Sequence, residues 1–199
     1  LAYINKKLLV FNEVCHSCGG CILLCPQKAL KEKYKLVGTV QKGISSVSGN
    51  VNVMTGMLNT GEASGVPIIK KLIKDIFSDY PNKDDVVIVD CPPGSACVVM
   101  ESVKEVDYCV LAAEPTIFGV HNLNMVYELV KLFKKPFGVV LNKCIDEENP
   151  SEEFCLKNKV KILAKIPFSE EFGTYNSKAL IACNENPEYK ELFSNLLYT

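Results

Sequence analysis

The stretch Tyr108-Cys-Val-Leu-Ala-Ala113, then Gly119 to Lys134, then Phe137-Gly-Val-Val-Leu-Asn142 decides the fold class. The first and last runs are short and largely apolar, which is typical of buried strands. Between them, apolar residues such as Leu123 and Tyr127 recur at the spacing of a helix face. A strand, a helix and a second strand in this order form a βαβ unit with parallel strands. The stretch therefore predicts an α/β fold.

The alternation of helix and strand continues on both sides of this stretch. The apolar run Val86-Val-Ile-Val-Asp90 predicts a parallel strand covered on both faces. The last helix has a start signal in Asn186 as N-cap and Pro187 at the first position. Further helices are expected around residues 69–77, 95–106 and 151–158, and a further strand over 160–166. We expect a mostly parallel sheet flanked by helices.

The pattern before residue 60 is different. Short β-like segments cover 7–12, 34–40 and 51–58, and glycine and serine mark the turns between them. The sequence therefore predicts a small region over residues 1–60 and an α/β domain over 61–199.

Composition excludes several classes of protein. The net charge of −1 gives no support for a nucleic-acid partner, and no apolar run approaches the ~20 residues that span a bilayer. The first residues do not resemble a signal peptide. Ten cysteines in a chain of 199 residues suit a reduced compartment better than a disulfide framework. We expect a cytoplasmic protein.

Four of the cysteines form the run Cys15-His-Ser-Cys18-Gly-Gly-Cys21-Ile-Leu-Leu-Cys25-Pro26. Its spacing, C-x2-C-x2-C-x3-C-P, is that of a bacterial ferredoxin cluster loop. The two glycines permit the tight turns that aim several thiolates at one centre. A zinc site is the alternative, although zinc usually takes two separated pairs of cysteines. Cys25 either completes the local cluster or binds a second one, as in two-cluster ferredoxins.

Other candidate residues follow the predicted strands, at the edge where open α/β sheets bind ligands. Asp90 ends one strand and is followed by Cys-Pro-Pro-Gly94, Glu114 follows the next, and Asn142-Lys143 and Pro167-Phe168 follow the last two. An acid here can hold a Mg²⁺-bound water, and a glycine amide can approach a γ-phosphate. The pattern favours a nucleotide site, although a structural role for Glu114 is equally open.

The combination of Asp90-Cys-Pro-Pro-Gly94, Glu114-Pro-Thr-Ile-Phe-Gly-Val-His121, Phe137-Gly-Val-Val-Leu-Asn-Lys143 and the cysteine run resembles one family. It is similar to the MinD-superfamily P-loop ATPases with an inserted ferredoxin domain, relatives of the nitrogenase iron protein and of ParA. The resemblance implies a [4Fe-4S] cluster on the four cysteines in a small ferredoxin-like α+β insert. It also implies ATP with Mg²⁺, a redox partner protein and a possible homodimer.

The same resemblance implies the roles of single residues. Asp90 would hold Mg²⁺ and water as the catalytic acid, and Gly94 would sense the γ-phosphate. Asn142 and Lys143 would flank the base, with the Pro167-Phe168 loop packing near it.

The sequence departs from this family in two respects. No Gly-Lys pair occurs in it, so the phosphate loop ending Gly-Lys-[Ser/Thr] and its strand are absent, and no second cysteine run precedes Cys15. The expectation is a chain without the amino-terminal part of its family's domain. Two functions stay open: an ATPase coupled to electron transfer or cluster handling, and a ferredoxin-type carrier without ATPase activity. For a third, a positioning ATPase of the MinD or ParA type, the sequence shows no basic stripe or amphipathic terminal helix.

Overall fold

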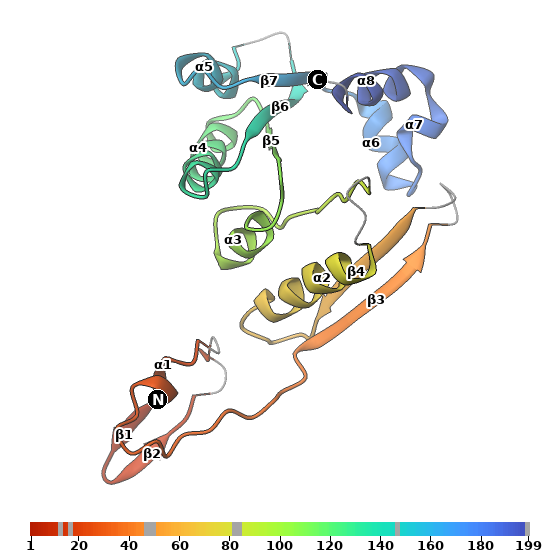
Figure 1. Ribbon diagram of the computed structural model, residues 1–199. Coiled ribbons are helices and arrows are strands. Elements are labelled where there is room, and N and C mark those ends of the chain that lie inside the picture. The colour runs from red at the N-terminus through yellow and green to blue at the C-terminus, as the bar shows by residue number, and fades with distance from the viewer. Residues whose placement is uncertain (12–13, 16–17, 46–50, 81–84, 146–147, 198–199) are drawn as a thin grey trace. The chain divides into compact units, whose positions relative to one another are not determined.

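Figure 1 shows a computed structural model of the chain, which describes residues 1–11, 14–15, 18–45, 51–80, 85–145 and 148–197. The contacts within the chain divide it into two compact units, Leu1–Pro92 and Pro93–Thr199. The boundary of 60 expected from the sequence lies inside the first of these units.

The second unit is built on a three-stranded parallel sheet. Its strands are β5 (Cys109–Ala113), β6 (Phe137–Cys144) and β7 (Ile162–Pro167), in the order β5-β6-β7. Three helices alternate with them: α3 (Cys97–Val103), α4 (Ile117–Leu132) and α5 (Pro150–Lys157). The predicted α/β class and the parallel sheet are confirmed.

The core of the second unit lies where α4 and α5 cover this sheet. Val130, Val139, Leu141 and Cys155 are fully buried in it. The ring of Tyr127 packs edge-on between Phe137 and Phe154, with centroids 5.6 and 5.3 Å away. Contacts of this kind stabilise a core beyond the apolar area that they bury. The core therefore fixes β6, the central strand, and with it the loops at the end of the sheet.

Three helices close the chain: α6 (Glu170–Ser177), α7 (Ala182–Glu185) and α8 (Pro187–Leu197). The predicted start of α8 is confirmed, because Asn186 Oδ1 accepts a hydrogen bond of 2.9 Å from the Glu188 amide. No helix was predicted from the sequence at α6 or α7. α6 begins at Ser169, whose hydroxyl accepts the Phe172 amide at 3.1 Å.

The described residues of the first unit form two antiparallel hairpins and two helices. The hairpins are β1 (Ala2–Ile4) with β2 (Lys7–Leu9), and β3 (Gly38–Ile44) with β4 (Asn52–Leu58). The helices are α1 (Gly20–Leu23) and α2 (Val66–Asp79), and α2 packs on β3 and β4. Gly56 makes this packing possible, because a Cβ there would stand 2.3 Å from Ile68 Cγ2.

The prediction of a strand over Val86–Asp90 is wrong. The segment has no regular secondary structure, and the side chains of Val86 and Ile88 are 88% and 84% exposed. An apolar run becomes a strand only when a neighbouring strand pairs with its backbone. None of the strand pairs among the described residues includes this segment.

Candidate functional site

Several of the predicted site residues lie at or just beyond the carboxyl ends of β5, β6 and β7. Glu114 follows β5, Asn142 and Lys143 lie near the end of β6, and Phe168 follows β7. All of them belong to the second unit. The structure thus brings together four residues that the sequence placed at strand ends.

A bulge in β6 shapes this edge. Leu141 pairs with Lys165 of β7 and Cys144 pairs with Pro167, so three steps along β6 match two along β7. Asn142 and Lys143 occupy the extra position, and Lys143 has a left-handed backbone with φ 56°. Bulges of this kind turn side chains out of the regular alternation and are frequent next to active sites. The Asn-Lys pair is therefore presented at the sheet edge rather than used in the ladder.

An ion pair joins the loop after β5 to the end of β6. Lys143 Nζ lies 2.6 Å from Glu114 Oε1, and the two side chains are 55% and 48% exposed. An exposed pair of this kind contributes about 0–1 kcal/mol to folding stability. Because the pair costs so little to open, both charged groups stay available to a ligand.

The backbone of Glu114 is held more firmly than its side chain. Its carbonyl oxygen accepts the Thr116 amide at 2.8 Å and the hydroxyl of the fully buried Ser151 at 2.8 Å. Thr116 caps α4 by accepting the Gly119 amide at 2.9 Å. A Cβ on Gly119 would stand 2.2 Å from the Glu114 carbonyl oxygen, so this position has room only for glycine.

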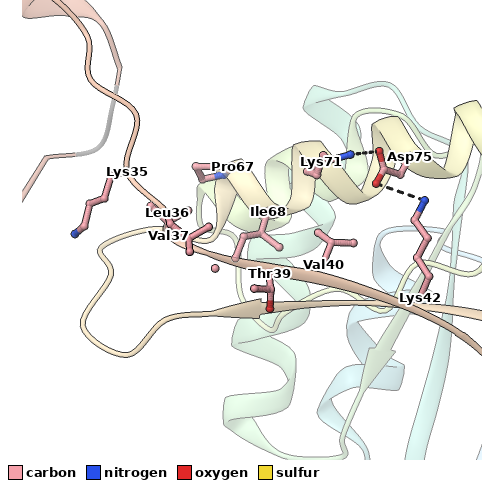
Figure 2. Close-up of a pocket in the computed structure, with 11 residues that line it drawn as sticks. Lys35, Leu36, Val37, Thr39, Val40, Lys42, Pro67, Ile68, Lys71 and Asp75 are labelled. Carbon is pink, nitrogen blue, oxygen red and sulfur yellow. Dashed lines mark hydrogen bonds and ion pairs between the residues drawn. The ribbon is translucent and has the colours of Figure 1, made fainter.

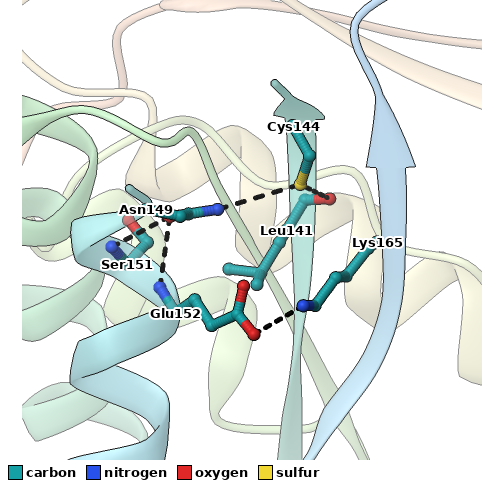
Figure 3. Close-up of polar contacts among 6 residues, drawn as sticks. All are labelled: Leu141, Cys144, Asn149, Ser151, Glu152 and Lys165. Atoms are coloured by element: carbon teal, nitrogen blue, oxygen red, sulfur yellow. Dashed lines mark hydrogen bonds and ion pairs between the residues drawn. The ribbon is translucent and has the colours of Figure 1, made fainter. Parts of the chain in front are cut away.

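Asn149 fixes the start of α5 to the end of β6 (Figure 3). Its Oδ1 accepts the amides of Ser151 and Glu152 at 3.0 and 3.2 Å, which makes it the N-cap of α5. Its Nδ2 donates to Cys144 Sγ at 3.8 Å. Burial raises the pKa of the Cys144 thiol, so this sulfur is present as the neutral thiol.

Two further contacts join β7 and the residue after it to α5 and to the end of β6. Lys165 Nζ lies 2.5 Å from Glu152 Oε1, and the Phe168 amide donates to the Cys144 carbonyl at 2.8 Å. The Phe168 ring remains 57% exposed, and Pro167 is exposed as well. The loop is therefore fixed by its backbone while its aromatic ring faces solvent.

The other two predicted nucleotide residues lie elsewhere in the chain. Asp90 belongs to the first unit, where it is exposed and in the irregular segment after Ile88. Gly94 belongs to the second unit and has φ 93°, a left-handed conformation that favours glycine. The need for glycine at residue 94 agrees with a specific loop conformation after Pro93.

The structure describes all four cysteines of the run. Cys15, Cys18 and Cys21 are exposed and Cys25 is half-buried. Within the described residues, no three His, Cys, Asp or Glu side chains are gathered closely enough to hold a metal ion. His16 and Ser17, which lie between the first two cysteines, are outside the described residues.

The donor chemistry of the run nevertheless fits an iron–sulfur cluster. Four thiols at this spacing supply the ligand set that such clusters use. Gly19, with φ 73°, turns the chain into α1, and Gly20 lies next to Cys18, whose sulfur would be 3.7 Å from an added Cβ. Backbone N–H groups, first that of Ala29, lower the pKa of the Cys25 thiol, although burial opposes them. A thiolate is the form that binds metal.

A separate cavity of about 460 Å³ lies between β3 and α2 in the first unit (Figure 2). The charges at its wall are paired: Lys42 lies 2.5 Å from Asp79 and 3.7 Å from Asp75, and Lys71 also binds Asp75. The Lys71 hydrogen bond lowers the pKa of Asp75. Because its charges are satisfied within the fold, we do not assign a function to this cavity.

The solved structures most useful for comparison are two MinD proteins. The MinD cell division protein of Aquifex aeolicus superposes with a TM-score of 0.61 at 14% identity, over 79% of this chain and 67% of that one. The cell division ATPase MinD of Pyrococcus furiosus gives 0.58 at 23% identity, over 74% of this chain and 64% of that one. The chain therefore has a MinD-like α/β fold.

Two proteins of Methanocaldococcus jannaschii, both uncharacterized, are similar in sequence. One is 27% identical over 98% of this chain and 75% of its own length, and the other is 24% identical over 72% and 50%. The chain thus spans half the length of the second relative. No protein-family model matches the chain. None of the helices in the described ranges has the length and apolar character needed to cross a membrane.

Sequence reasoning missed Asn149, Ser151 and Thr116, which hold the site in place. Asn149-Pro150 is an N-cap followed by proline at the first helical position, so a local signal for Asn149 was present. No local signal identifies Ser151, because its partner, the Glu114 carbonyl, is 37 residues away.

Proposed function

We propose that this chain is part of an iron–sulfur protein that couples ATP binding and hydrolysis to electron transfer or cluster handling. One observation carries the proposal: the ferredoxin-type run Cys15 to Cys25 and a MinD-like fold occur in a single chain. Either feature alone is compatible with many functions. Together they favour a nucleotide-dependent protein with a redox centre.

In this proposal the four cysteines hold a [4Fe-4S] cluster, which would supply one-electron transfer. Cys15 and Cys18 precede α1 and are exposed, Cys21 lies within the helix and is exposed as well, and Cys25 follows it. The amides near Ala29 that face the Cys25 sulfur favour its thiolate. Cys25 is either the fourth ligand of this cluster or a ligand of another one.

The carboxyl end of the sheet would bind the nucleotide with Mg²⁺ in the whole protein. Asn142 and Lys143, displaced by the bulge, would flank the base together with Pro167 and Phe168. Gly94 would approach the γ-phosphate. Asp90 would hold the Mg²⁺-bound water and act as the catalytic acid. Phosphate binding also requires a Gly-Lys-[Ser/Thr] loop, which the 199 residues do not contain.

The cluster is tested by anaerobic reconstitution of the chain with iron and sulfide. We expect broad visible absorption that disappears in C15S, C18S and C21S, whereas C97S, an exposed cysteine outside the run, keeps it. C25S decides between the two roles of Cys25: loss of the signal makes it a local ligand. Zinc in place of iron, with no visible absorption, would remove the cluster from the proposal.

The nucleotide part is tested on the whole natural protein with a fluorescent ATP analogue and a phosphate-release assay. N142A is expected to weaken nucleotide binding, and D90A to abolish phosphate release. A natural coding sequence without Gly-Lys-[Ser/Thr], or binding that neither variant alters, would leave the alternative: a ferredoxin-type electron carrier without ATPase activity.

A further inference from the structure

Charge is distributed unevenly along the chain. Residues 1–35 contain six lysines and two glutamates, a net charge of +4, although the whole chain carries −1. The remaining residues therefore carry −5. The cysteine run lies within the basic segment.

Part of the basic segment lies near the cysteine run in space as well as in sequence. A Cβ built on Gly19 would stand 4.0 Å from Glu32 Oε1, so the chain around Glu32 returns beside the start of α1. Lys31 and Lys33 flank this contact. Gly19 itself lies between Cys18 and Cys21, so the segment around Glu32 lies near the cysteine run.

Three lysines here have ammonium groups without an acidic partner among the described residues: Lys28, Lys31 and Lys33. All three are exposed. Three other lysines of the described part of the unit do have acidic partners, among them Lys35 with Glu62 at 2.8 Å and Lys42 with Asp79 at 2.5 Å. Unpaired ammonium groups are the ones that the carboxylates of another molecule can approach without breaking a contact.

Exposed apolar side chains lie among these charges. Leu23 and Leu24, between Cys21 and Cys25, are 85% and 79% exposed, and the ring of Tyr34 is fully exposed. Apolar groups surrounded by charge form the usual pattern of a protein interface, an apolar centre with a polar rim. Redox encounters have small interfaces and rely on charge for orientation and rate.

We infer that Lys28, Lys31, Lys33, Leu23 and Leu24 form a docking surface for an acidic electron-transfer protein. The inference rests on the proposed cluster, because electrons pass only between centres that are brought close together, and this surface borders the cysteines. Charge complementarity identifies the partner: it presents carboxylates around a small apolar contact. An anionic membrane or a nucleic acid is less suited, because these five residues include neither an arginine nor an aromatic ring.

The test uses the chain reconstituted anaerobically with its cluster, and a small acidic ferredoxin as the probe. Binding is measured by calorimetry over a range of salt concentrations. The triple variant K28Q/K31Q/K33Q is expected to bind about tenfold more weakly and to lose most of the salt dependence. A matched triple variant in the second unit, K134Q/K159Q/K178Q, removes the same charge from exposed lysines and is expected to bind as the unaltered chain does.

The double variant L23S/L24S tests the contribution of the apolar residues separately from that of the lysines around them. We expect weaker binding with an unchanged salt slope. The visible absorption of every variant is recorded first, because it reports on the cluster independently of docking. Equal binding by both lysine triples overturns the docking surface, as does preferential binding to anionic vesicles or to an oligonucleotide. A chain that forms the cluster but does not bind the ferredoxin overturns the docking surface alone, whereas a chain that forms no cluster overturns the proposed function as well.

Discussion

The two units of this chain differ sharply in how they bury their apolar residues. Of the buried hydrophobic residues among the described part of the chain, only Ile68 lies in Leu1–Pro92, and all the others lie in Pro93–Thr199. The described part of the first unit has two hairpins with the helices α1 and α2, whereas the second unit has a parallel sheet covered by helices. Parallel strands need cover on both faces, and antiparallel hairpins can leave one face to solvent. The loops at the end of the parallel sheet therefore stand on a packed core, whereas the region around the cysteines is open to solvent.

The largest expected effect on stability comes from creating a cavity in the core of the second unit. Leu141 in β6 is fully buried, so L141A is expected to lower the free energy of unfolding by about 2–5 kcal/mol. The matched change in the first unit is M57A in β4, where the side chain is 54% exposed and the expected loss is below about 0.5 kcal/mol. Urea unfolding followed by circular dichroism measures both. Equal losses would mean that the two units are equally well packed.

Glycine substitutions probe the same contrast at the backbone. G119A places a methyl group against the Glu114 carbonyl and is expected to lower stability by about 1–3 kcal/mol. Gly43 in β3 has no neighbouring atom within 4 Å of an added Cβ, so G43A is expected to be neutral or slightly stabilising. Thermal unfolding of the two variants gives the comparison. A neutral G119A would contradict the close approach of α4 to the β5 loop.

Removal of a single buried hydroxyl group is expected to have a smaller effect on stability. S151A removes the donor to the Glu114 carbonyl, which keeps its bond from the Thr116 amide, and we expect a loss of about 1 kcal/mol. S64A in the first unit removes a longer contact, 3.3 Å from Ser64 Oγ to the Val66 amide, and should cost less. In the whole protein, S151A should also weaken nucleotide binding if the β5 loop forms part of the site. Chemical denaturation and the ATP-analogue assay separate the two readouts.

The reactivity of one thiol in each unit gives a further comparison, and its measurement does not depend on a change in folding stability. Backbone N–H groups lower the pKa of Cys25 in the first unit, whereas burial raises the pKa of Cys155 in the second. A lower pKa gives more thiolate at neutral pH, and the thiolate is the reactive form. In metal-free protein, iodoacetamide should therefore modify Cys25 before Cys155, and the rate at Cys25 should fall only at lower pH. Mass spectrometry of peptides after timed alkylation measures this order, and faster modification of Cys155 would contradict it.

Local signals predicted the parts of the fold in which neighbours in sequence are also neighbours in space. The start of α8 at Asn186 and Pro187 is one case, because a cap and its amide are two residues apart. The strands β5, β6 and β7 are another, because their apolar runs are packed against the helices next to them in the chain. Val86–Asp90 shows the limit: the same kind of run is not a strand here, since a strand also depends on a partner that its own residues do not specify.

The candidate site likewise has some features that local sequence signals predicted and others that depend on distant residues. The sequence placed Asn142, Lys143 and Phe168 at strand ends, and the structure puts them at one edge of the sheet. The β6 bulge, the Glu114–Lys143 ion pair and the Ser151 hydroxyl could not be predicted. Each of them depends on register or on contacts between residues far apart in the chain.

By itself the sequence determined the α/β class of this protein, the ferredoxin-type cysteine spacing and the residues that follow each strand. Those properties depend on residue type, periodicity and short-range chemistry. Only the tertiary structure decided which apolar runs are strands, how Asn142 and Lys143 leave the ladder, and which lysines lie unpaired beside the cysteines. The physical reason is that backbone pairing, burial and charge compensation are satisfied by distant partners, whose positions are fixed only when the whole chain has folded.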